Sequence, residues 1–299
     1  MRSVKNALRQ LLASVRMLLI FTAVLGVAYP LVITAIAQVP GLQSRADGST
    51  VSRDGKVVGS KLIGQSFTGA DGKALVQYFQ SRPSAAGNGY DPTASSASNL
   101  GPESIVDRLP DPALKNGSGQ PSLLTQVCAR SLAAGQLEGV SGARPFCTPD
   151  GVGAVLAVFY AGPGYAGRIT RVVSLNQSAP AKPFLTTYRA VPVEAARFGA
   201  DYSAGQVVPI RGDAPAEPVV PPDAVTASGS GLDPEISAAY AQLQAARVAK
   251  ARRISMAQVE TLVADYRAGR DLGVLGEARV NVLQLNLALD RAYPYPKPH

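Results

Sequence analysis

The sequence predicts an α+β protein, in which a single N-terminal transmembrane helix precedes an exported mixed α/β domain with a β-rich insertion. Three observations predict this class: an apolar run behind a basic N-terminus, short β-type runs in the middle of the chain, and helix patterns in its last third. With 299 residues, of which 46% are hydrophobic, the chain is long enough to bury a core. Its net charge of +8 fits a membrane-facing protein, and no basic run with interleaved aromatics suggests nucleic-acid binding.

The first forty residues predict a membrane anchor. Residues 1–16 form a basic segment without acids, and residues 17–37 form an uncharged apolar run. About 20 apolar residues at about 1.5 Å each span a hydrocarbon core of about 30 Å. The positive-inside rule places the N-terminus in the cytoplasm and the bulk of the chain outside it, at the plasma membrane. The alternative is a cleaved signal peptide, since residues 35–37 resemble an A-x-A site, but such apolar regions usually run about 7–15 residues.

Residues 38–102 are expected to form the first part of the exported domain. The run Arg53-Asp54-Gly55-Lys56 predicts a hairpin, because Asp-Gly supplies the positive φ angles of a tight turn. Residues 74–82 predict a short helix that stops before Pro83. Residues 89–102 are small, polar and almost free of apolar residues.

Residues 103–221 are expected to form an inserted subdomain, because Pro and Gly punctuate both of its ends. Inside it, residues 123–136 have helical spacing, and residues 154–161 and 168–176 read as two strands of a hairpin. Cys128 and Cys147 are the only cysteines, and outside the cytoplasm such a pair is expected to be oxidised to a disulfide.

Residues 222–299 are expected to complete the exported domain with two helices and a terminal strand. Asp233 is the expected N-cap of the first helix, with Pro234 in its first turn. Ser255 with Gln258 predicts a capping box for the second helix, which should end at Gly269. Alternating leucines in residues 279–290 favour a half-buried strand, although a helix is also possible.

The stretch DAVTASGSGLDPEIS, residues 223–237, resembles a reactive loop but lacks the partners that chemistry needs. Ser230 is outside a G-x-S-x-G elbow, and the only histidine is the terminal His299. A Ser–Lys dyad with Lys61 or Lys250 remains an alternative. Neither a P-loop ending nor a dinucleotide fingerprint is present, and the ligand inventory is too small for zinc. We therefore expect no catalytic, cofactor or metal site in this chain.

A docking surface is the remaining interpretation of this stretch. Residues 91–100 and residues 223–234 share Thr-Ala-Ser and lie on opposite sides of the insertion. Two loops of small polar residues could together form a tightly packed surface for another protein. The expected docking residues are Ser98, Asn99, Thr226, Ser228, Ser230, Gly231 and Asp233.

In several separated stretches the chain resembles the C subunit of the Kdp potassium-transporting P-type ATPase (KdpC). These stretches are YPLVITAIAQ, GSKLIGQSF, YFQSRPSA, SSASNLGP, DAVTASGSGLDPEIS, RVAKAR and VNVLQLNLALD. They cover the chain up to Pro102 and again from Pro222. The segment between them is far longer than the usual connection in the family, so the resemblance assigns it no role.

The resemblance implies a single-span, non-catalytic subunit of a high-affinity potassium uptake complex. Its implied partners are a channel-like potassium-translocating subunit and an ATP-hydrolysing P-type subunit, which handle potassium and ATP. The family is described as supporting assembly and as a catalytic chaperone that raises the ATP affinity of the pump subunit. With only residues 1–16 expected in the cytoplasm, such an effect should be allosteric. The competing hypothesis is a membrane-anchored exported serine hydrolase or sensor unrelated to a pump.

Overall fold

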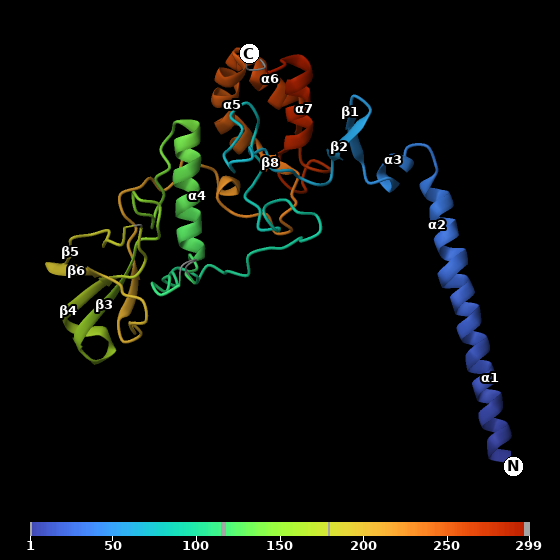
Figure 1. The fold of residues 1–299 in the computed structure, drawn as a ribbon, viewed down its shortest axis with the longest axis horizontal. Coiled ribbons are helices and arrows are strands. Elements are labelled where there is room, and N and C mark those ends of the chain that lie inside the picture. Colours follow the sequence, from blue (N-terminus) through green and yellow to red (C-terminus); the bar gives the residue numbers. More distant parts are fainter. Residues whose placement is uncertain (1, 115–117, 179, 296–299) are drawn as a thin grey trace. The chain divides into compact units, whose positions relative to one another are not determined.

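A computed structural model describes residues 2–114, 118–178 and 180–295 (Figure 1). The chain divides into two compact units, one up to Leu62 and the other from Ile63 onward, and each is described by itself. Both helices and strands are present, which confirms the α+β class.

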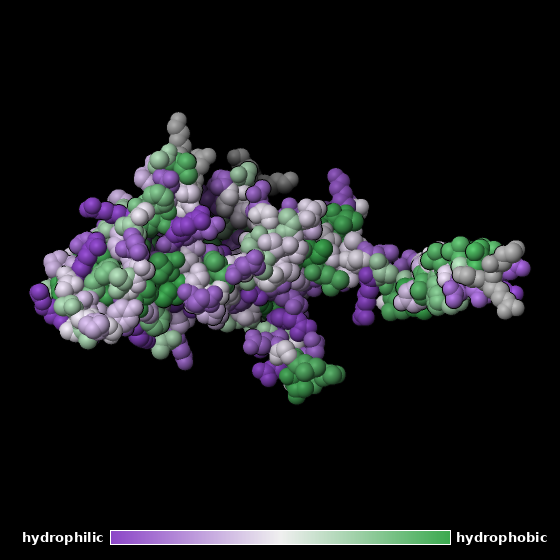
Figure 2. Space-filling model, turned by 90° about the horizontal axis from the view of Figure 1, so that it is seen from below, coloured by the Kyte–Doolittle hydropathy of each residue, from purple (hydrophilic) through white to green (hydrophobic). Residues whose placement is uncertain are grey.

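The first unit opens with a long apolar helix, made of α1 (Arg2–Ala23), a π-helical turn η1 (Val24–Ala28) and α2 (Tyr29–Ala37). Residues 4–37 are long and apolar enough to cross a membrane, and no residue of the most apolar stretch is buried. The π-helical turn ends two residues before Pro30, which lacks the N–H of a regular helical hydrogen bond. Figure 2 shows the mostly hydrophobic surface of this helix. The basic residues expected before the span belong to the same continuous helix.

After α3 (Gln43–Ala46), the first unit ends in the predicted hairpin. Strand β1 (Thr50–Arg53) pairs antiparallel with β2 (Lys56–Ser60). The turn residues Asp54 and Gly55 have φ angles of 52° and 75°, the left-handed conformation that Asp-Gly adopts readily. The hairpin prediction is therefore confirmed.

The C-terminal third builds the main core of the second unit. Helices α5 (Ala238–Arg252), α6 (Met256–Asp265) and α7 (Val282–Ala292) pack around it. A small antiparallel sheet lies beside them, in the order β8 (Glu235–Ser237), β10 (Arg279–Asn281) and β9 (Arg267–Ala268). The fully buried centre of this core includes Ala241, Ala245, Val248, Val259, Leu285 and Leu289.

The predicted terminal strand is wrong for most of its length, because only residues 279–281 are extended and α7 follows. Asn281 caps this helix, and its side-chain oxygen accepts a hydrogen bond from Gln284 N at 3.0 Å. The four alternating leucines are all buried, at 9% exposure or less, because α7 is covered on several sides. Their alternation therefore does not mark the single buried face of a strand. Leucine is also a strong helix former, which is consistent with the helix observed here.

The predicted helix at residues 74–82 is also wrong, because the core uses this segment in an irregular conformation. Two buried amide side chains, those of Asn286 and Gln244, bind the backbone of this segment. Asn286 Oδ1 accepts from Phe79 N at 2.9 Å, and Asn286 Nδ2 donates to Phe79 O at 2.9 Å. Gln244 does the same for Gln80, with distances of 2.6 and 3.1 Å. Figure 1 shows the cyan segment beside the orange and red helices that supply these amides.

The middle of the chain contains the predicted helix α4 (Leu123–Glu138) and the predicted hairpin of β3 (Val155–Gly162) and β4 (Ala166–Ser174). The hairpin belongs to a five-stranded sheet in the order β5-β6-β4-β3-β7. Its other strands are β5 (Thr187–Tyr188), β6 (Val191–Ala195), parallel to β4, and β7 (Gln206–Pro209). Helix α4 packs on α5 and adds Val127 and Ala134 to the main core, so this part of the segment is built into the domain.

Candidate docking site formed by two polar loops

The two polar loops, residues 91–100 and 223–234, lie side by side and are called the loop pair below. Ser96 N donates to Ser230 O at 3.1 Å, and Ser95 Oγ donates to the same carbonyl oxygen at 2.8 Å. Nearby, Ser228 N donates to Pro83 O at 2.9 Å. Segments separated by the whole insertion are therefore joined directly through the backbone.

Gly231 lies where the second loop closely approaches Ala86 and Ser96. Its φ angle is +74°, and a Cβ atom there would lie 2.6 Å from Ala86 Cβ and 2.9 Å from Ser96 O. The Gly231 carbonyl also accepts a hydrogen bond from Ser84 Oγ at 2.7 Å. Both the conformation and the space demand glycine, so this residue fixes the geometry of the pair.

The predicted N-cap Asp233 is wrong, because α5 begins five residues later and Ser237 caps it. Ser237 Oγ accepts from Tyr240 N at 3.0 Å, and the Asp223 carboxylate accepts from Ser237 N at 2.7 Å. Residues 235–237 pair with β10 as a strand, and this long-range pairing delays the helix start. Asp233 instead binds Arg82, with Nη1 and Oδ2 separated by 2.9 Å. At the second helix Ser255 caps α6 through the predicted capping box.

Arg82 links the two sides of the site, although sequence analysis did not single it out. Besides Asp233, its guanidinium lies 3.4 Å from the carbonyl oxygens of Thr226 and Ala227. The Arg82 carbonyl accepts from Tyr90 Oη at 2.9 Å, and burial raises the pKa of Tyr90 to about 12. The only signal in the sequence was the position of Arg82 within the YFQSRPSA stretch.

The hydroxyl of Ser230 is held by a local hydrogen-bond network. In the described part of the chain it accepts from Leu232 N at 3.1 Å, lies 3.3 Å from Asp233 Oδ1 and lies 3.4 Å from Ser228 Oγ. A nucleophilic serine needs a base that can take its proton, typically an imidazole or an amine. His299 lies outside the described residues. These contacts stabilise a turn.

The seven predicted docking residues divide into a surface group and an internal group. Ser98, Asn99, Thr226 and Ser230 are exposed, whereas Ser228 and Gly231 are buried and Asp233 is half-buried. A cavity of about 340 Å³ adjoins the second loop. Its charged residues are largely paired, as Arg82 with Asp233 and Arg279 with Glu235. No group of three or more metal-ligating side chains occurs among the described residues.

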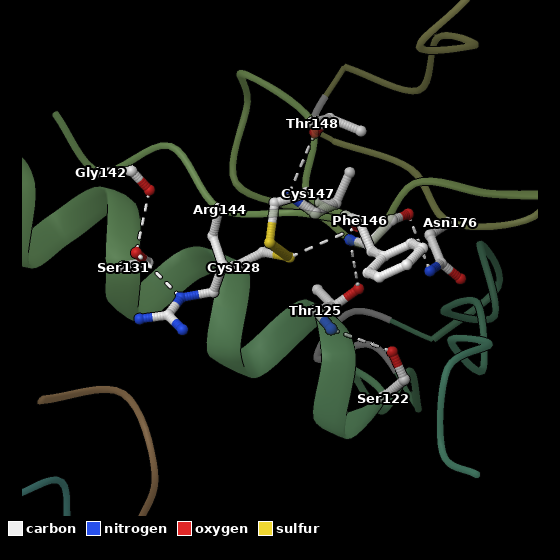
Figure 3. The surroundings of a disulfide bond; sticks show 12 residues. Ser122, Thr125, Cys128, Ser131, Gly142, Arg144, Phe146, Cys147, Thr148 and Asn176 are labelled. Atoms are coloured by element: carbon white, nitrogen blue, oxygen red, sulfur yellow. Dashed lines mark hydrogen bonds between the residues drawn. A yellow bond between two sulfur atoms is a disulfide. The ribbon is translucent and has the colours of Figure 1, made fainter. Parts of the chain in front are cut away.

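The disulfide joins α4 to the loop that precedes β3 (Figure 3). Cys128 and Cys147 are bonded, with a Cα–Cα distance of 5.4 Å. Thr125, one helical turn before Cys128, accepts from Gly153 N at 3.0 Å, and Ser131 on the next turn donates to Gly142 O at 2.9 Å. The disulfide and these hydrogen bonds fasten one face of α4 to the connection that leads into the five-stranded sheet.

These features define a class of protein. It is a membrane-associated protein with a membrane-compatible helix and a mixed second unit, which is the scaffold that holds the loop pair. Comparison with known proteins makes this class specific. The family model described as "K+-transporting ATPase, c chain" matches residues 11–108 and 201–291.

Curated relatives match nearly the whole chain. A "Potassium-transporting ATPase KdpC subunit" of Mycobacterium tuberculosis (strain ATCC 25618 / H37Rv) is 37% identical over 283 residues, covering 95% of this chain and 98% of the relative. One of Kineococcus radiotolerans is 37% identical over 289 residues, covering 97% of each. The chain therefore belongs to the KdpC family and is an accessory subunit of a potassium uptake complex.

The two comparisons differ over the middle of the chain. The family model leaves residues 109–200 unmatched, within the expected insertion of residues 103–221. The Mycobacterium relative nevertheless aligns over 95% of this chain, so it carries most of this segment as well. The long central segment is thus a shared feature of these relatives.

Proposed function

We propose that the second unit is an exported domain that docks on the partner subunits through the exposed edge of the loop pair, and so supports assembly. The observation that carries this proposal is the fixed pairing of two distant loops at Gly231 and Ser230. This pairing orders Ser98, Asn99 and Thr226 at the surface before any partner arrives. A preordered polar surface loses little conformational entropy on binding.

The proposed partners are the two larger subunits of the pump, a channel-like potassium-translocating subunit and an ATP-hydrolysing P-type subunit. Potassium and ATP are handled by these subunits, and this chain acts without catalysis of its own. Its N-terminal helix crosses the plasma membrane once, with the N-terminus in the cytoplasm. The cations before the apolar run support this orientation through the positive-inside rule.

The same topology shapes the proposed effect on ATP. An exported domain cannot touch a cytoplasmic nucleotide site, so it raises ATP affinity by favouring one conformation of its partners. Coupling of this kind typically amounts to about 1–3 kcal/mol, or roughly 5–150-fold in affinity. The chain would then be a chaperone in the thermodynamic sense, through differential binding to two pump states.

The test places bulky cations on the exposed edge of the loop pair. Asn99→Arg combined with Thr226→Arg should reduce co-purification of the two partner subunits in mild detergent and lower potassium-stimulated ATP hydrolysis. Thr187→Arg, on the exposed edge strand β5, is the matched control. Normal assembly and turnover of the double variant would overturn the docking proposal.

The alternative of a membrane-anchored serine hydrolase or sensor has a separate test. Ser230→Ala should assemble with the partners and keep potassium-stimulated turnover within about threefold of the parent, whereas losing a nucleophile costs orders of magnitude. Normal assembly with abolished turnover would show that the loop performs chemistry.

A further inference from the structure

A loop with an apolar tip protrudes between strands β9 and β10 of the second unit. The tip consists of Leu272, Val274 and Leu275, which are 90%, 73% and 57% exposed. In the described part of this unit, the first two are the most exposed of the large apolar side chains. Such side chains cluster at one point on a surface when they contact something apolar outside the protein.

Most backbone amides of this tip donate hydrogen bonds within the loop. Asp271 N donates to Leu275 O at 2.8 Å, and Leu275 N donates to Asp271 O at 2.9 Å. Val274 N donates to Asp271 O, and Gly273 N donates to Arg270 O, both at 3.2 Å. A segment that enters lipid must pair its polar backbone groups internally, because the bilayer interior supplies no partners.

The charges at the base of the tip fit an anionic surface. Two acids lie in this loop: Asp271 is paired with Arg279, with Oδ2 and Nη2 3.1 Å apart, and Glu277 is exposed. Arg279 also binds Glu235 at 3.0 Å, which holds it at the base of the loop. Arg267 and Arg270 are exposed on the same connection. An apolar tip behind exposed arginines is the pattern of segments that bind at a membrane interface.

We propose that this tip inserts into the interfacial region of the bilayer that the N-terminal helix spans, with Arg267 and Arg270 against lipid phosphates. Three apolar side chains bind a membrane only weakly from free solution. Residues 38–62 tether the unit to the span, and tethering of this kind raises the effective concentration to the order of millimolar. A weak interaction then suffices to orient the second unit relative to the membrane. This inference stands on the anchor and does not depend on the docking role of the loop pair.

The test measures the depth of the tip in lipid with the full-length chain. Val274→Cys is labelled with a polarity-sensitive fluorophore, with the native disulfide closed, in vesicles of mixed neutral and anionic phospholipids. Tyr165→Cys is the control, because Tyr165 is 50% exposed at the turn between β3 and β4. The emission of the Val274 label should shift to the blue and be quenched by lipids brominated in their acyl chains. The Tyr165 label should do neither.

Charge and partner variants complete the test. Arg267→Glu combined with Arg270→Glu, or removal of the anionic lipid, should reduce the quenching at position 274. Equal responses at positions 274 and 165 would overturn the proposal. A blue shift that occurs only when the partner subunits are added, and also in detergent without lipid, would overturn it too and assign the tip to an apolar socket on a partner protein.

Discussion

Glu138 of α4 and Arg247 of α5 form an ion pair in which both side chains are almost completely buried. Arg247 Nε lies 3.0 Å from Glu138 Oε2, and the two side chains are 7% and 1% exposed, respectively. Arg247 also donates to the carbonyl oxygens of Val76 and Tyr78 at 2.6 and 2.9 Å. Burial raises the pKa of Glu138, and the Arg247 charge opposes this shift. One pair thus joins the central segment, the irregular segment of residues 74–82 and the C-terminal helices.

Glu138→Ala is expected to lower the free energy of unfolding by roughly 3–5 kcal/mol, because it leaves the buried Arg247 charge without its carboxylate. Chemical denaturation of the purified chain in detergent measures this loss. A double-mutant cycle with Arg247→Met should give a combined loss smaller than the sum of the two single losses. Losses that add within about 0.5 kcal/mol would show that the two charges do not stabilise each other.

Gly231→Val should cost several kcal/mol and also weaken assembly. The added side chain would meet Ala86 and Ser96 and would hold a β-branched residue at a φ angle of +74°. Thermal unfolding and partner co-purification are the measurements. Gly229→Val is the matched control, because a Cβ there meets nothing within 4 Å. Equal effects at both positions would contradict the close approach at Gly231.

Ser237→Ala should destabilise the protein by about 0.5–2 kcal/mol, the usual cost of removing an N-cap. The loss arises at the Tyr240 amide, which donates to Ser237 Oγ. Ser237→Asp supplies another capping oxygen, but it would repel the adjacent Asp223 carboxylate. Ser237→Thr is therefore the better conservative control and should keep most of the stability measured by denaturation. If Ser237→Ala and Ser237→Thr are equally destabilised, capping is not the cause.

Tyr90 should make the folded state sensitive to strongly alkaline pH. Its pKa is raised to about 12 in the folded protein, first by burial, against 10.0 for the free side chain. The neutral phenol is therefore favoured by folding, and its contribution is fully present below pH 10. It is lost as the pH rises towards 12, by up to about 2–3 kcal/mol.

Tyr90→Phe tests this dependence. The variant should be less stable than the parent at pH 8, because it lacks the hydrogen bond to Arg82 O. It should lose less stability than the parent between pH 10 and 12 in thermal unfolding scans. If the variant and the parent lose the same stability between pH 10 and 12, Tyr90 is not the titrating group.

Replacing both cysteines by alanine should lower stability by about 3 kcal/mol in the chain-entropy model, for the loop that the disulfide closes across a sequence separation of 19. Mass analysis without reductant should show Cys128 joined to Cys147 in the parent. Rapid alkylation of both thiols in the untreated protein would contradict the bridge and the proposed compartment. Denaturation with and without reductant provides the stability comparison.

Features encoded in short stretches could be predicted from the sequence. The membrane-compatible run, the Asp54–Gly55 turn, the helix at residues 123–138 and the capping box at Ser255 each depend on neighbouring residues. Their respective signals are a run of apolar residues, an Asp-Gly pair, a helical spacing of apolar residues and a Ser–Gln capping pair. Each signal depends on interactions between residues close in sequence.

Features that depend on residues distant in sequence could not be predicted. Asp233 is a good N-cap in isolation, but residues 235–237 pair with residues 279–281 and move the helix start. The segment around Phe79 has helical composition, yet two amides from α5 and α7 bind it in an irregular conformation. Within the candidate site, the sequence identified the exposed serines and Gly231. It did not indicate Arg82, whose importance arises only when the loops meet.

The bond between Phe79 and Asn286 also imposes an order on how the protein is made. These residues are 207 positions apart, so at a synthesis rate of about 5–20 residues per second Phe79 emerges roughly 10–40 s before its partner. Until α7 arrives, the hydrophobic centre of the domain stays open to proteases and to other nascent chains. Contacts this remote also slow folding. A chain that ended before Val282 would lack α7, so its core would stay open and we expect it to be degraded.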